Sequence, residues 1–318
     1  MDRTSGNLGR IAYLGPRGTF SEEALLGEAD LVGSELVPTV TIPDAIVAVA
    51  SGEVDAAFVP FENTIEGSVN LTLDQLVFDV DLFIQREVVL EVHMDLLARA
   101  GETLDSITRV LSFPFATAQV RGYLAANLAR AAVEATNSTA DGARLLGDLD
   151  FDGLGCAAVA PPLTAKIYGL NVLAHAIEDH HGNQTRFLLV TTDGVPAPTG
   201  HDRTTIACFQ PSDRPGSLYD ILGSFFARSL NLTRIESRPT RRGLGDYCFV
   251  IEFEGHVQDD ATGECLRELQ TTGVHVKFLG SYPVHGGLSS PRPSKEEQAL
   301  INPDDWLEDL RSKGLPPI

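Results

Sequence analysis

The sequence predicts an α/β protein with two lobes, a cleft between them, and a smaller C-terminal domain. Three observations favour this fold class. Short apolar runs alternate with segments of helical periodicity between residues 11 and 177, which is typical of βαβ units. A strand expected over 82–94 leaves the first lobe, and a strand that begins at Thr185 returns to it. A βαββαβ pattern then follows a linker rich in proline and glycine, 194–203.

Length and charge limit the classes of partner. A chain of 318 residues with 43% hydrophobic residues is long enough for two or three packed domains. The formal net charge of -20 argues against nucleic acid or an anionic membrane as the main partner. A small anionic substrate is still compatible with this charge, provided that backbone N–H groups or a few arginines hold it locally.

The cysteines and the N-terminus indicate the compartment. The four cysteines form no CxxC pair, and three of them lie in apolar runs, which favours buried free thiols in a reducing environment. The polar segment 1–10 has no apolar core of signal-peptide length, and no later run is long enough to cross a bilayer. We therefore expect a soluble, cytoplasmic protein.

The first 193 residues are expected to form the two lobes. The first lobe is predicted to cover about 8–85 and 178–193, and the second about 86–177. The expected strands of the two lobes are 11–14, 35–40, 56–60, 82–94, 108–111, 132–135, 155–160, 170–177 and the strand from Thr185. The expected helices are 22–31, 44–50, 69–78, 114 to about 128, one that starts at Ser138 or Thr139, and one that ends at Tyr168.

A glycine-rich turn follows the first strand and is the first candidate site. Gly15-Pro16-Arg17-Gly18 precedes Thr19 or Ser21, either of which is a suitable helix N-cap. Unpaired N–H groups at such a helix start can hold an anion. A simple tight turn between strand and helix explains the two glycines equally well. The segment matches neither GxGxxG nor a Walker loop, so it implies no nucleotide cofactor.

Three further polar clusters lie where predicted strands begin or end. Glu62 and Asn63 follow the strand 56–60, and they could exchange a proton and bond a hydroxyl or a carboxylate, although a hinge loop whose side chains cap the next helix is the alternative. Ser112 ends a strand, and Gln119 lies on the helix that follows. Asn183 to Thr185 form the last cluster, at the mouth of the returning strand. Because ligands of open α/β sheets bind at such strand ends, all four clusters are expected to face the cleft.

The C-terminal domain has the order of elements of a ferredoxin-like unit. Its expected strands are 204–210, 232–239, 246–254 and 276–279, and its expected helices are 217–229 and 260–271. The alternation of Tyr247, Phe249 and Ile251 with their neighbours fits a strand with one buried face. The tail 284–318 is polar and is expected to contain a short helix near 304–311.

No metal site is predicted. His180 and His181 are adjacent on a loop after Glu178 and Asp179, and neighbouring histidines do not share one ion in the way that an i, i+4 helical pair does.

The ordered motifs resemble the family of monofunctional prephenate dehydratases with a C-terminal ACT regulatory domain. The motifs that carry the resemblance are IAYLGPRGTFSEEAL (11–25), VPFENTIEGSV (59–69), Ser112 with Gln119, NQTRF (183–187), PGSL (215–218) and ESRP (236–239). The resemblance places a catalytic domain at 8–193 and the ACT domain at 204–283. It implies a two-lobed fold like that of type II periplasmic binding proteins.

The resemblance also implies an activity. Such a carbon-oxygen lyase converts prephenate to phenylpyruvate with loss of water and carbon dioxide, in phenylalanine biosynthesis, without a cofactor. Thr185 would be the essential catalytic residue, and Glu62, Asn63, Ser112 and Gln119 would line the cleft. The loop at Gly18 and Thr19 would hold a substrate carboxylate. Arg186 would help to bind the carboxylates, or it would be structural, since strand alternation points it away from Thr185.

The family pattern further implies regulation and assembly. L-phenylalanine would bind between two paired ACT domains and act as a feedback inhibitor. The implied effector contacts are Gly216, Ser217, Leu218, Glu236, Ser237, Arg238 and Pro239. Pairing would make the protein a homodimer or a homotetramer. The chain departs from the family pattern at Arg17, an added positive charge near the proposed carboxylate site, and at Asp141, whose role as an acid stays open.

Two alternative functions fit the same sequence. An arogenate dehydratase would use the same site on an amino substrate. A non-catalytic amino-acid sensor would join a binding-protein-like module to an ACT domain, but such a binder has no need to combine Thr185 with Glu62 and Asn63.

Overall fold

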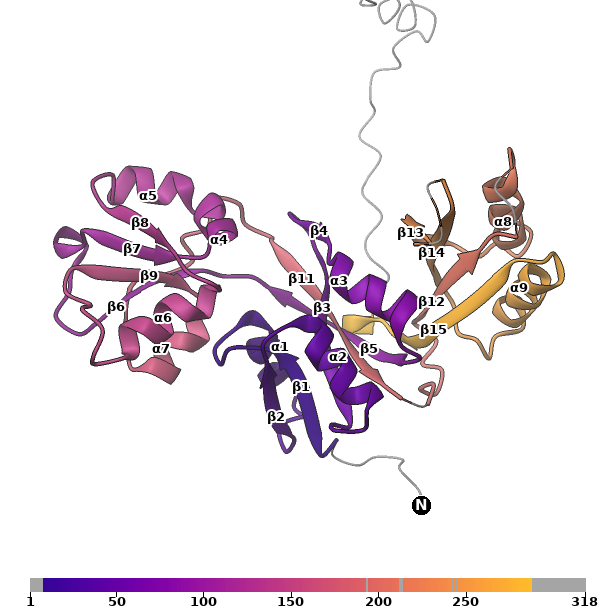
Figure 1. Ribbon diagram of the computed structural model, residues 1–318, viewed down its shortest axis with the longest axis horizontal. Coiled ribbons are helices and arrows are strands. Elements are labelled where there is room, and N and C mark those ends of the chain that lie inside the picture. The colour runs from indigo at the N-terminus through magenta and orange to yellow at the C-terminus, as the bar shows by residue number, and fades with distance from the viewer. Residues whose placement is uncertain (1–7, 193, 212–213, 242, 244, 288–318) are drawn as a thin grey trace, which may run out of the picture. The chain divides into compact units, whose positions relative to one another are not determined.

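The computed structural model describes residues 8–192, 194–211, 214–241, 243 and 245–287, whose arrangement is drawn in Figure 1. Helices and strands alternate along the two lobes, and three separate sheets form. The helix predicted near 304–311 lies outside the described residues. In the described part of the chain, every helix is too short or too polar to cross a membrane.

The first lobe is built on a sheet with the strand order β2-β1-β3-β11-β5. β1 runs parallel to β2 and β3, whereas β11 runs antiparallel to β3 and β5. The strands are β1 (Arg10–Leu14), β2 (Glu35–Thr39), β3 (Ala56–Asn63), β5 (Phe83–Glu91) and β11 (Gln184–Thr191), with the short β4 (Gly67–Ser68) paired to β3. Since β11 lies between β3 and β5, the chain must return from the second lobe before this sheet is complete.

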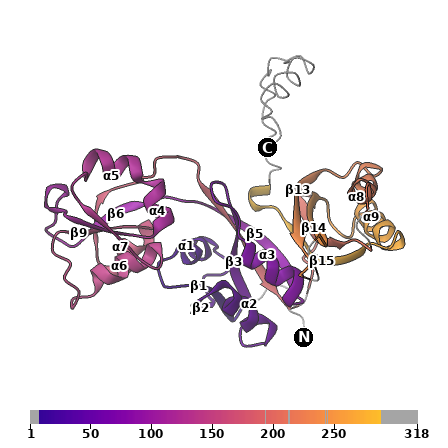
Figure 2. The same ribbon diagram turned by 45° about the horizontal axis from the view of Figure 1, so that its top comes forward.

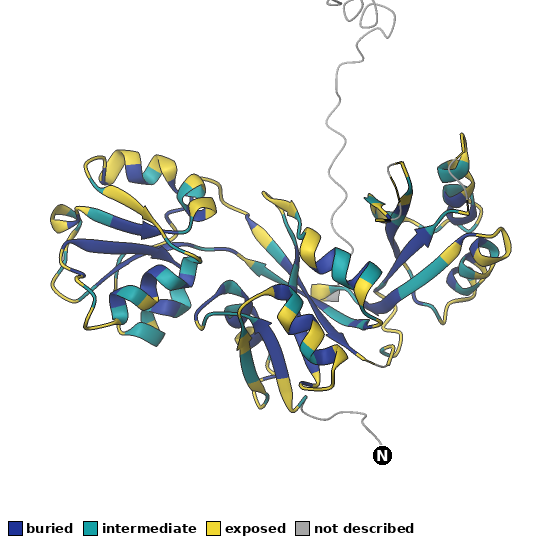
Figure 3. Ribbon diagram, viewed as in Figure 1, coloured by how far each residue is buried: buried dark blue, intermediate teal, exposed yellow. Residues whose placement is uncertain are grey.

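The helices of the first lobe cover the sheet. They are α1 (Phe20–Gly27), α2 (Ile42–Ala50) and α3 (Asn70–Asp74), which continues as a π-helical turn (Gln75–Asp79). α2 begins at a capping box, in which the Thr41 hydroxyl accepts a hydrogen bond from the Asp44 N–H and the Asp44 carboxylate accepts one from the Thr41 N–H. Its apolar face packs into the core (Figure 3).

The second lobe repeats this arrangement. Its sheet has the order β8-β7-β9-β6-β10, and β6, which arrives from the other lobe, is antiparallel to both of its neighbours, as β11 is in the first sheet. The strands are β6 (Asp95–Ala98), β7 (Arg109–Ser112), β8 (Ala132–Ala135), β9 (Cys156–Ala160) and β10 (Asn171–Ala174). The helices are a 3-10 turn (Leu104–Ser106), α4 (Pro114–Gln119), α5 (Arg121–Asn127), α6 (Thr139–Gly147) and α7 (Pro162–Tyr168). The matching orders confirm the predicted two-lobed α/β fold.

Two segments, 92–94 and 175–183, connect the lobes. Glu178 joins them, because its carboxylate contacts His93 Nδ1 at 2.8 Å and accepts from the Met94 N–H at 3.0 Å. The hydrogen bond to Glu178 raises the pKa of His93 above its ordinary value. The Asp179 carboxylate caps α5 by accepting from the N–H groups of Gly122 and Tyr123. Glu178 and Asp179, which precede His180 and His181, therefore have structural partners.

Two expectations about this region are wrong. The strand predicted over 82–94 ends at Glu91 as β5, residues 92–94 are irregular, and a separate strand, β6, follows at 95–98. Residues 86–91 pair with β11, so the first lobe extends to Glu91 rather than to 85. The helix predicted from 114 to about 128 breaks at Val120, whose φ of -116° and ψ of 15° are not helical. The Gln119 carbonyl accepts from the Asp179 N–H at 2.7 Å, and the buried Val120 side chain packs into the lobe's core.

The C-terminal domain has an antiparallel sheet with the order β13-β14-β12-β15, which confirms the predicted βαββαβ unit (Figure 2). Its elements are β12 (Asp202–Phe209), α8 (Ser217–Phe226), β13 (Leu232–Pro239), β14 (Tyr247–Glu254), α9 (Asp260–Thr271), β15 (His275–Pro283) and a 3-10 turn (His285–Gly287). One face of the sheet packs against α8 and α9 through Phe225 and Leu269. The other face shares a core with the first lobe, in which Val250 and Tyr282 join Ile84.

Candidate active site

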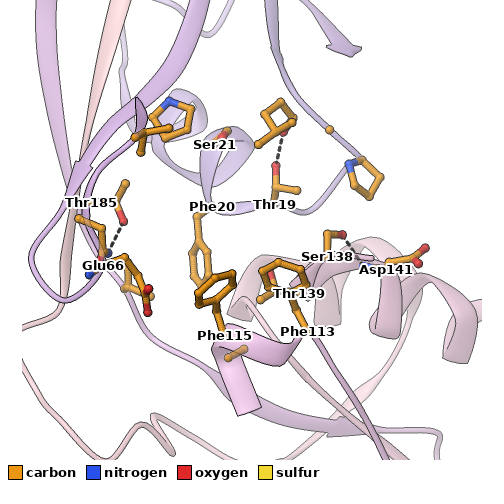
Figure 4. Close-up of a pocket in the computed structure, with 18 of the residues that line it drawn as sticks. Thr19, Phe20, Ser21, Glu66, Phe113, Phe115, Ser138, Thr139, Asp141 and Thr185 are labelled. Atoms are coloured by element: carbon orange, nitrogen blue, oxygen red, sulfur yellow. Dashed lines mark hydrogen bonds between the residues drawn. The ribbon is translucent and has the colours of Figure 1, made fainter. Parts of the chain in front are cut away.

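A cavity of about 720 Å³ is lined by residues of both lobes. Apolar side chains supply much of its wall, among them Phe20 from α1 and Phe113 and Phe115 at the start of α4 (Figure 4). Thr185 and Glu66 lie at one end, and Ser138 and Thr139 lie on the second lobe opposite α1 (Figure 4). The polar residues of the lining are Thr19, Ser21, Thr39, Asn63, Glu66, Gln119, Asn137, Ser138, Thr139, Asp141, Asn183 and Thr185.

Asn63 fixes the direction of the Thr185 hydroxyl. The Asn63 side-chain oxygen accepts from the backbone N–H groups of Ile65 and Glu66, at 2.9 and 3.0 Å. Its amide nitrogen must therefore be the group that donates to Thr185 Oγ1, at 2.9 Å. Because Thr185 accepts this bond, and no described residue accepts its own proton, the Thr185 O–H is free to donate into the cavity.

A chain of amide side chains continues from Asn63 to the second lobe. Asn63 Nδ2 also donates to Asn183 Oδ1 at 2.8 Å, and Asn183 Nδ2 donates to Gln119 Oε1 at 3.0 Å. Gln119 Nε2 then donates to Glu66 Oε1 at 3.3 Å. Asn183 is buried, so its amide has to be satisfied by protein groups, and this network does so. The network joins Thr185 in the first lobe to α4 in the second.

Strand alternation separates the predicted residues into two groups. Thr185 pairs with Asn63 across β11 and β3, and Arg186 pairs with Glu62 one step further. Successive side chains of a strand point to opposite faces, so Thr185 and Asn63 face the cavity while Arg186 and Glu62 face the C-terminal domain. Arg186 Nη2 contacts Glu62 Oε2 at 2.8 Å, and neither residue lines the cavity. The predicted cleft role of Glu62 and the predicted carboxylate role of Arg186 are therefore wrong.

Gly18 and Ser112 also lie outside the lining. The Gly18 N–H donates to the Glu22 carboxylate, so this amide does not face the cavity as an anion donor. Gly18 has a φ of +88° and lies against Thr164 of the second lobe, where an added Cβ would clash at 2.6 Å. Ser112 is buried, and its hydroxyl donates to the Phe113 carbonyl. The predicted site roles of Gly18 and Ser112 are therefore wrong, because the Gly18 N–H and the Ser112 hydroxyl already donate to other groups of the protein.

Thr19 does line the cavity, although its hydroxyl is engaged. It donates to the Leu14 carbonyl at 2.9 Å and holds the turn before α1. Gln119 lines the cavity as predicted. Asp141 accepts from Arg144 at 2.9 Å, and its N–H donates to Ser138 Oγ, which confirms Ser138 as the N-cap of α6.

Ser21 and Thr139 line the cavity, although the sequence did not predict them as site residues. Ser21 lies in the first turn of α1 and is only 4% exposed. Its hydroxyl has no hydrogen-bond partner among the described residues. Thr139 opens α6 on the other lobe. From the sequence, each is a candidate only for the start of a helix. Among the described lining residues the charged ones are Glu66 and Asp141, so this lining offers an anion hydroxyl and N–H donors but neither a lysine nor an arginine.

The predicted effector residues lie in two places on the C-terminal domain. Gly216 has a φ of +89° and precedes α8, which begins with Ser217 and Leu218. Glu236 and Arg238 on β13 contact the first lobe, where Glu236 Oε2 accepts from Ser68 Oγ at 2.7 Å and Arg238 Nη1 donates to Asn70 Oδ1 at 2.8 Å. Ser237 and Pro239 are exposed on the same strand.

The fold and the cavity define a two-lobed α/β protein that has a cavity lined by both lobes and carries a ferredoxin-like domain. Residues 11–194 match the family model of prephenate dehydratase, and residues 204–270 match that of the ACT domain. The chain therefore belongs to the prephenate dehydratase family.

Two relatives that are named prephenate dehydratase agree with this assignment, and a third similar structure carries another description. The prephenate dehydratase of Mycobacterium ulcerans (strain Agy99) is 40% identical over 318 residues, which cover 97% of this chain and 98% of the relative. The crystal structure of prephenate dehydratase from Arthrobacter aurescens in complex with L-Phe has a TM-score of 0.81 at 36% identity, covering 95% of this chain and 99% of that one. A structure described as GqqA, a novel type of quorum quenching acylase, has a TM-score of 0.76 at 28% identity, covering 87% and 98%.

Proposed function

We propose that this protein is a carbon-oxygen lyase that converts prephenate to phenylpyruvate, carbon dioxide and water, in the cytoplasmic synthesis of phenylalanine. The observation that carries the proposal is the Thr185 hydroxyl, which accepts from Asn63 and leaves its proton facing a largely apolar cavity. Family membership supports the same reaction.

The reaction needs a donor for the departing hydroxyl more than it needs a strong acid. Loss of the ring carboxylate as carbon dioxide releases an electron pair into the ring while the ring carbon–oxygen bond breaks, and the ring becomes aromatic. The departing hydroxide takes up one proton and leaves as water. A threonine hydroxyl is a weak acid, but a fixed donor can stabilise the negative charge that develops on the leaving oxygen.

The polar groups of the helix starts are suited to the two carboxylates of prephenate. Ser21 at the start of α1 and Thr139 at the start of α6 face the cavity from opposite lobes. Hydroxyl and N–H donors at helix N-termini attract anions without a full counter-charge. A carboxylate held without a lysine or an arginine keeps its tendency to lose carbon dioxide, because no ion pair stabilises it in the ground state.

The ACT domain supports feedback control by L-phenylalanine. The Arthrobacter aurescens relative is described with L-Phe bound, and this chain retains both segments of the family's effector motifs. We assign the effector contacts to 216–218 and to 236–239 of a paired domain. These residues would bias the equilibrium between open and closed lobes.

Pairing of ACT domains would make the protein a homodimer or a homotetramer. β13 is an edge strand of its sheet, and Ile235 is 46% exposed on it. Exposed edge strands with apolar side chains are ready for association. Light scattering should show a dimer or a larger species for the wild type and a smaller species for Ile235→Lys. A monomeric wild-type protein would contradict this assembly.

One assay separates the proposed activity from its alternatives. Purified protein is incubated with prephenate and, separately, with arogenate, and phenylpyruvate and phenylalanine are measured. We expect phenylpyruvate from prephenate at the higher kcat/KM. A preference for arogenate would make the protein an arogenate dehydratase, and the absence of product from both substrates would indicate an amino-acid sensor.

A further inference from the structure

Arg186 is the centre of a buried ionic cluster on the side of β11 opposite the cavity. It is 9% exposed, and its guanidinium lies 4.9 Å from the centre of the Phe61 ring. Nη1 donates to Glu87 at 3.1 Å, and Nη2 donates to Glu62 at 2.8 Å. Both nitrogens donate to the carboxylate of Glu252 on β14, at 3.2 and 2.7 Å. Arg186 therefore binds three strands, one of which belongs to the ACT domain.

The pair of Arg186 and Glu252 is held in one geometry. Glu252 is almost fully buried and accepts further hydrogen bonds from Thr205 Oγ1 and from the hydroxyl of Tyr282. The charge of Arg186 lowers the pKa of Glu252 despite its burial, so Glu252 is ionised at neutral pH. A buried two-point arginine–carboxylate pair is strong and directional, and losing one partner leaves an uncompensated charge. A shift of β14 must therefore move Arg186 with it.

The cluster lies directly behind the proposed catalytic hydrogen bond. Arg186 and Glu62 are the chain neighbours of Thr185 and Asn63, and the two pairs occupy adjacent positions of the same β3–β11 ladder. One face of the ladder carries the ion pair, and the other carries the bond that directs the Thr185 proton. A change in the ion pair would twist both strands beneath that bond.

The same cluster reaches the effector motif. Arg234 on β13 donates to Glu236 Oε2 at 2.7 Å and to Ser68 Oγ at 2.6 Å. Its other nitrogen lies 3.7 Å from Glu62. Glu236 belongs to the segment that we assign to phenylalanine. A continuous set of charged contacts thus runs from Glu236 through Arg234 and Glu62 to Arg186.

We propose that Arg186 is a positioning residue that transmits the state of the ACT domain to Thr185 through Glu252 and through Glu62 with Arg234. This inference rests on the proposed function, because it describes the control of the same site. Phenylalanine binding at the 236–239 segment would shift Arg234 and β14, and the displaced Arg186 would move Thr185 away from its productive position.

The test compares activity and phenylalanine inhibition in matched variants. Glu252→Gln should lower kcat about 10-fold while KM changes less than about 2-fold, because a positioning defect acts on the transition state. Glu254→Gln, at the exposed end of the same strand, is the control and should behave like the wild type. Arg186→Lys should retain more activity than Arg186→Met, because it keeps the charge but not the two-point geometry.

A second variant addresses transmission and leaves Arg186 itself unsubstituted. Calorimetry should show that phenylalanine still binds to Arg234→Gln. The fraction of activity that remains at saturating phenylalanine should, however, rise about 5-fold in this variant. Arg267→Gln, at an exposed position, is the control. Unchanged kcat in Glu252→Gln together with full inhibition of Arg234→Gln would overturn the inference. Failure of the proposed function is a separate result, since the wild-type protein would then form no phenylpyruvate from prephenate.

Discussion

At the scale of single residues, we expect the activity to depend on the direction of the Thr185 O–H bond. The Asn63 amide donates to Thr185 and cannot be turned over, since two backbone N–H groups hold its oxygen. Asn63→Asp replaces this donor with a carboxylate that accepts the Thr185 proton instead. We expect kcat for prephenate to fall about 100-fold, the cost typical of losing one oriented donor, with little change in the circular dichroism spectrum.

The matched control for this change is Asn127→Asp, at the exposed C-terminal end of α5. It introduces the same charge away from the cavity, and its kcat should equal that of the wild type. If Asn63→Asp turned over prephenate as fast as Asn127→Asp, the direction of the Thr185 proton would have no part in the reaction.

We expect Glu23 to make the stability of the fold depend on pH. Burial, reinforced by Asp95 and partly offset by His93, raises the pKa of Glu23 to about 7 in the folded protein. A raised pKa means that the contribution of Glu23 is fully present below its unfolded pKa, about 4.5, and is lost as the pH rises to about 7. The wild type should therefore lose unfolding free energy between pH 5 and pH 8. In Glu23→Gln this loss should be smaller, by on the order of 1 kcal/mol.

Urea denaturation at the two pH values measures this difference. Glu53→Gln on the surface of the first lobe serves as the control and should lose as much stability with pH as the wild type. An equal pH dependence for Glu23→Gln and wild type would show that Glu23 is ionised in the folded protein at pH 5.

At the scale of elements, the Gln119 side chain joins α4 to the first lobe by hydrogen bonds. Gln119 forms hydrogen bonds with Asn183 and Glu66, so it fixes the position of α4 relative to Thr185. Gln119→Ala should lower kcat/KM for prephenate about 10-fold, because the substrate is then held less closely to its productive position. Gln270→Ala, at an exposed position of α9, should leave kcat/KM unchanged. A wild-type kcat/KM for Gln119→Ala would show that Gln119 does not position the substrate.

Most of the elements could be predicted because the local pattern decides them. Apolar runs predicted β1, β3 and β9, and the Ser138 cap predicted the start of α6. The breaks at 92–94 and at Val120 could not be predicted, because long-range partners cause them: Glu178 binds the Met94 N–H, and Asp179 binds the Gln119 carbonyl. Such bonds join residues that are distant in the sequence.

The site shows the same division. Strand alternation already separated Thr185 from Arg186, and the structure extends that separation to Asn63 and Glu62. The sequence could not show that Glu22 takes the Gly18 N–H, nor which face of β3 the ACT domain covers. Side-chain partners of this kind become visible only when the lobes and the third domain are packed.

At the scale of the whole molecule, one β-ladder connects the cavity with the ACT domain. Its cavity face carries Asn63 and Thr185, and its other face carries Glu62 and Arg186 against the ACT domain. This arrangement explains how a domain that contributes no residue to the described cavity lining can still affect the reaction. Control would then come from small displacements of a shared sheet.

The most direct test of the central claim is prephenate turnover by the wild type and by Thr185→Val, which keeps the shape of the side chain and removes the hydroxyl. We expect phenylpyruvate from the wild type and a kcat at least about 100-fold lower for the variant, with KM within about 3-fold. Thr271→Ala, at the exposed C-terminal end of α9, should have the kcat of the wild type. Wild-type turnover by Thr185→Val would contradict the assignment of Thr185 as the donor to the leaving hydroxyl.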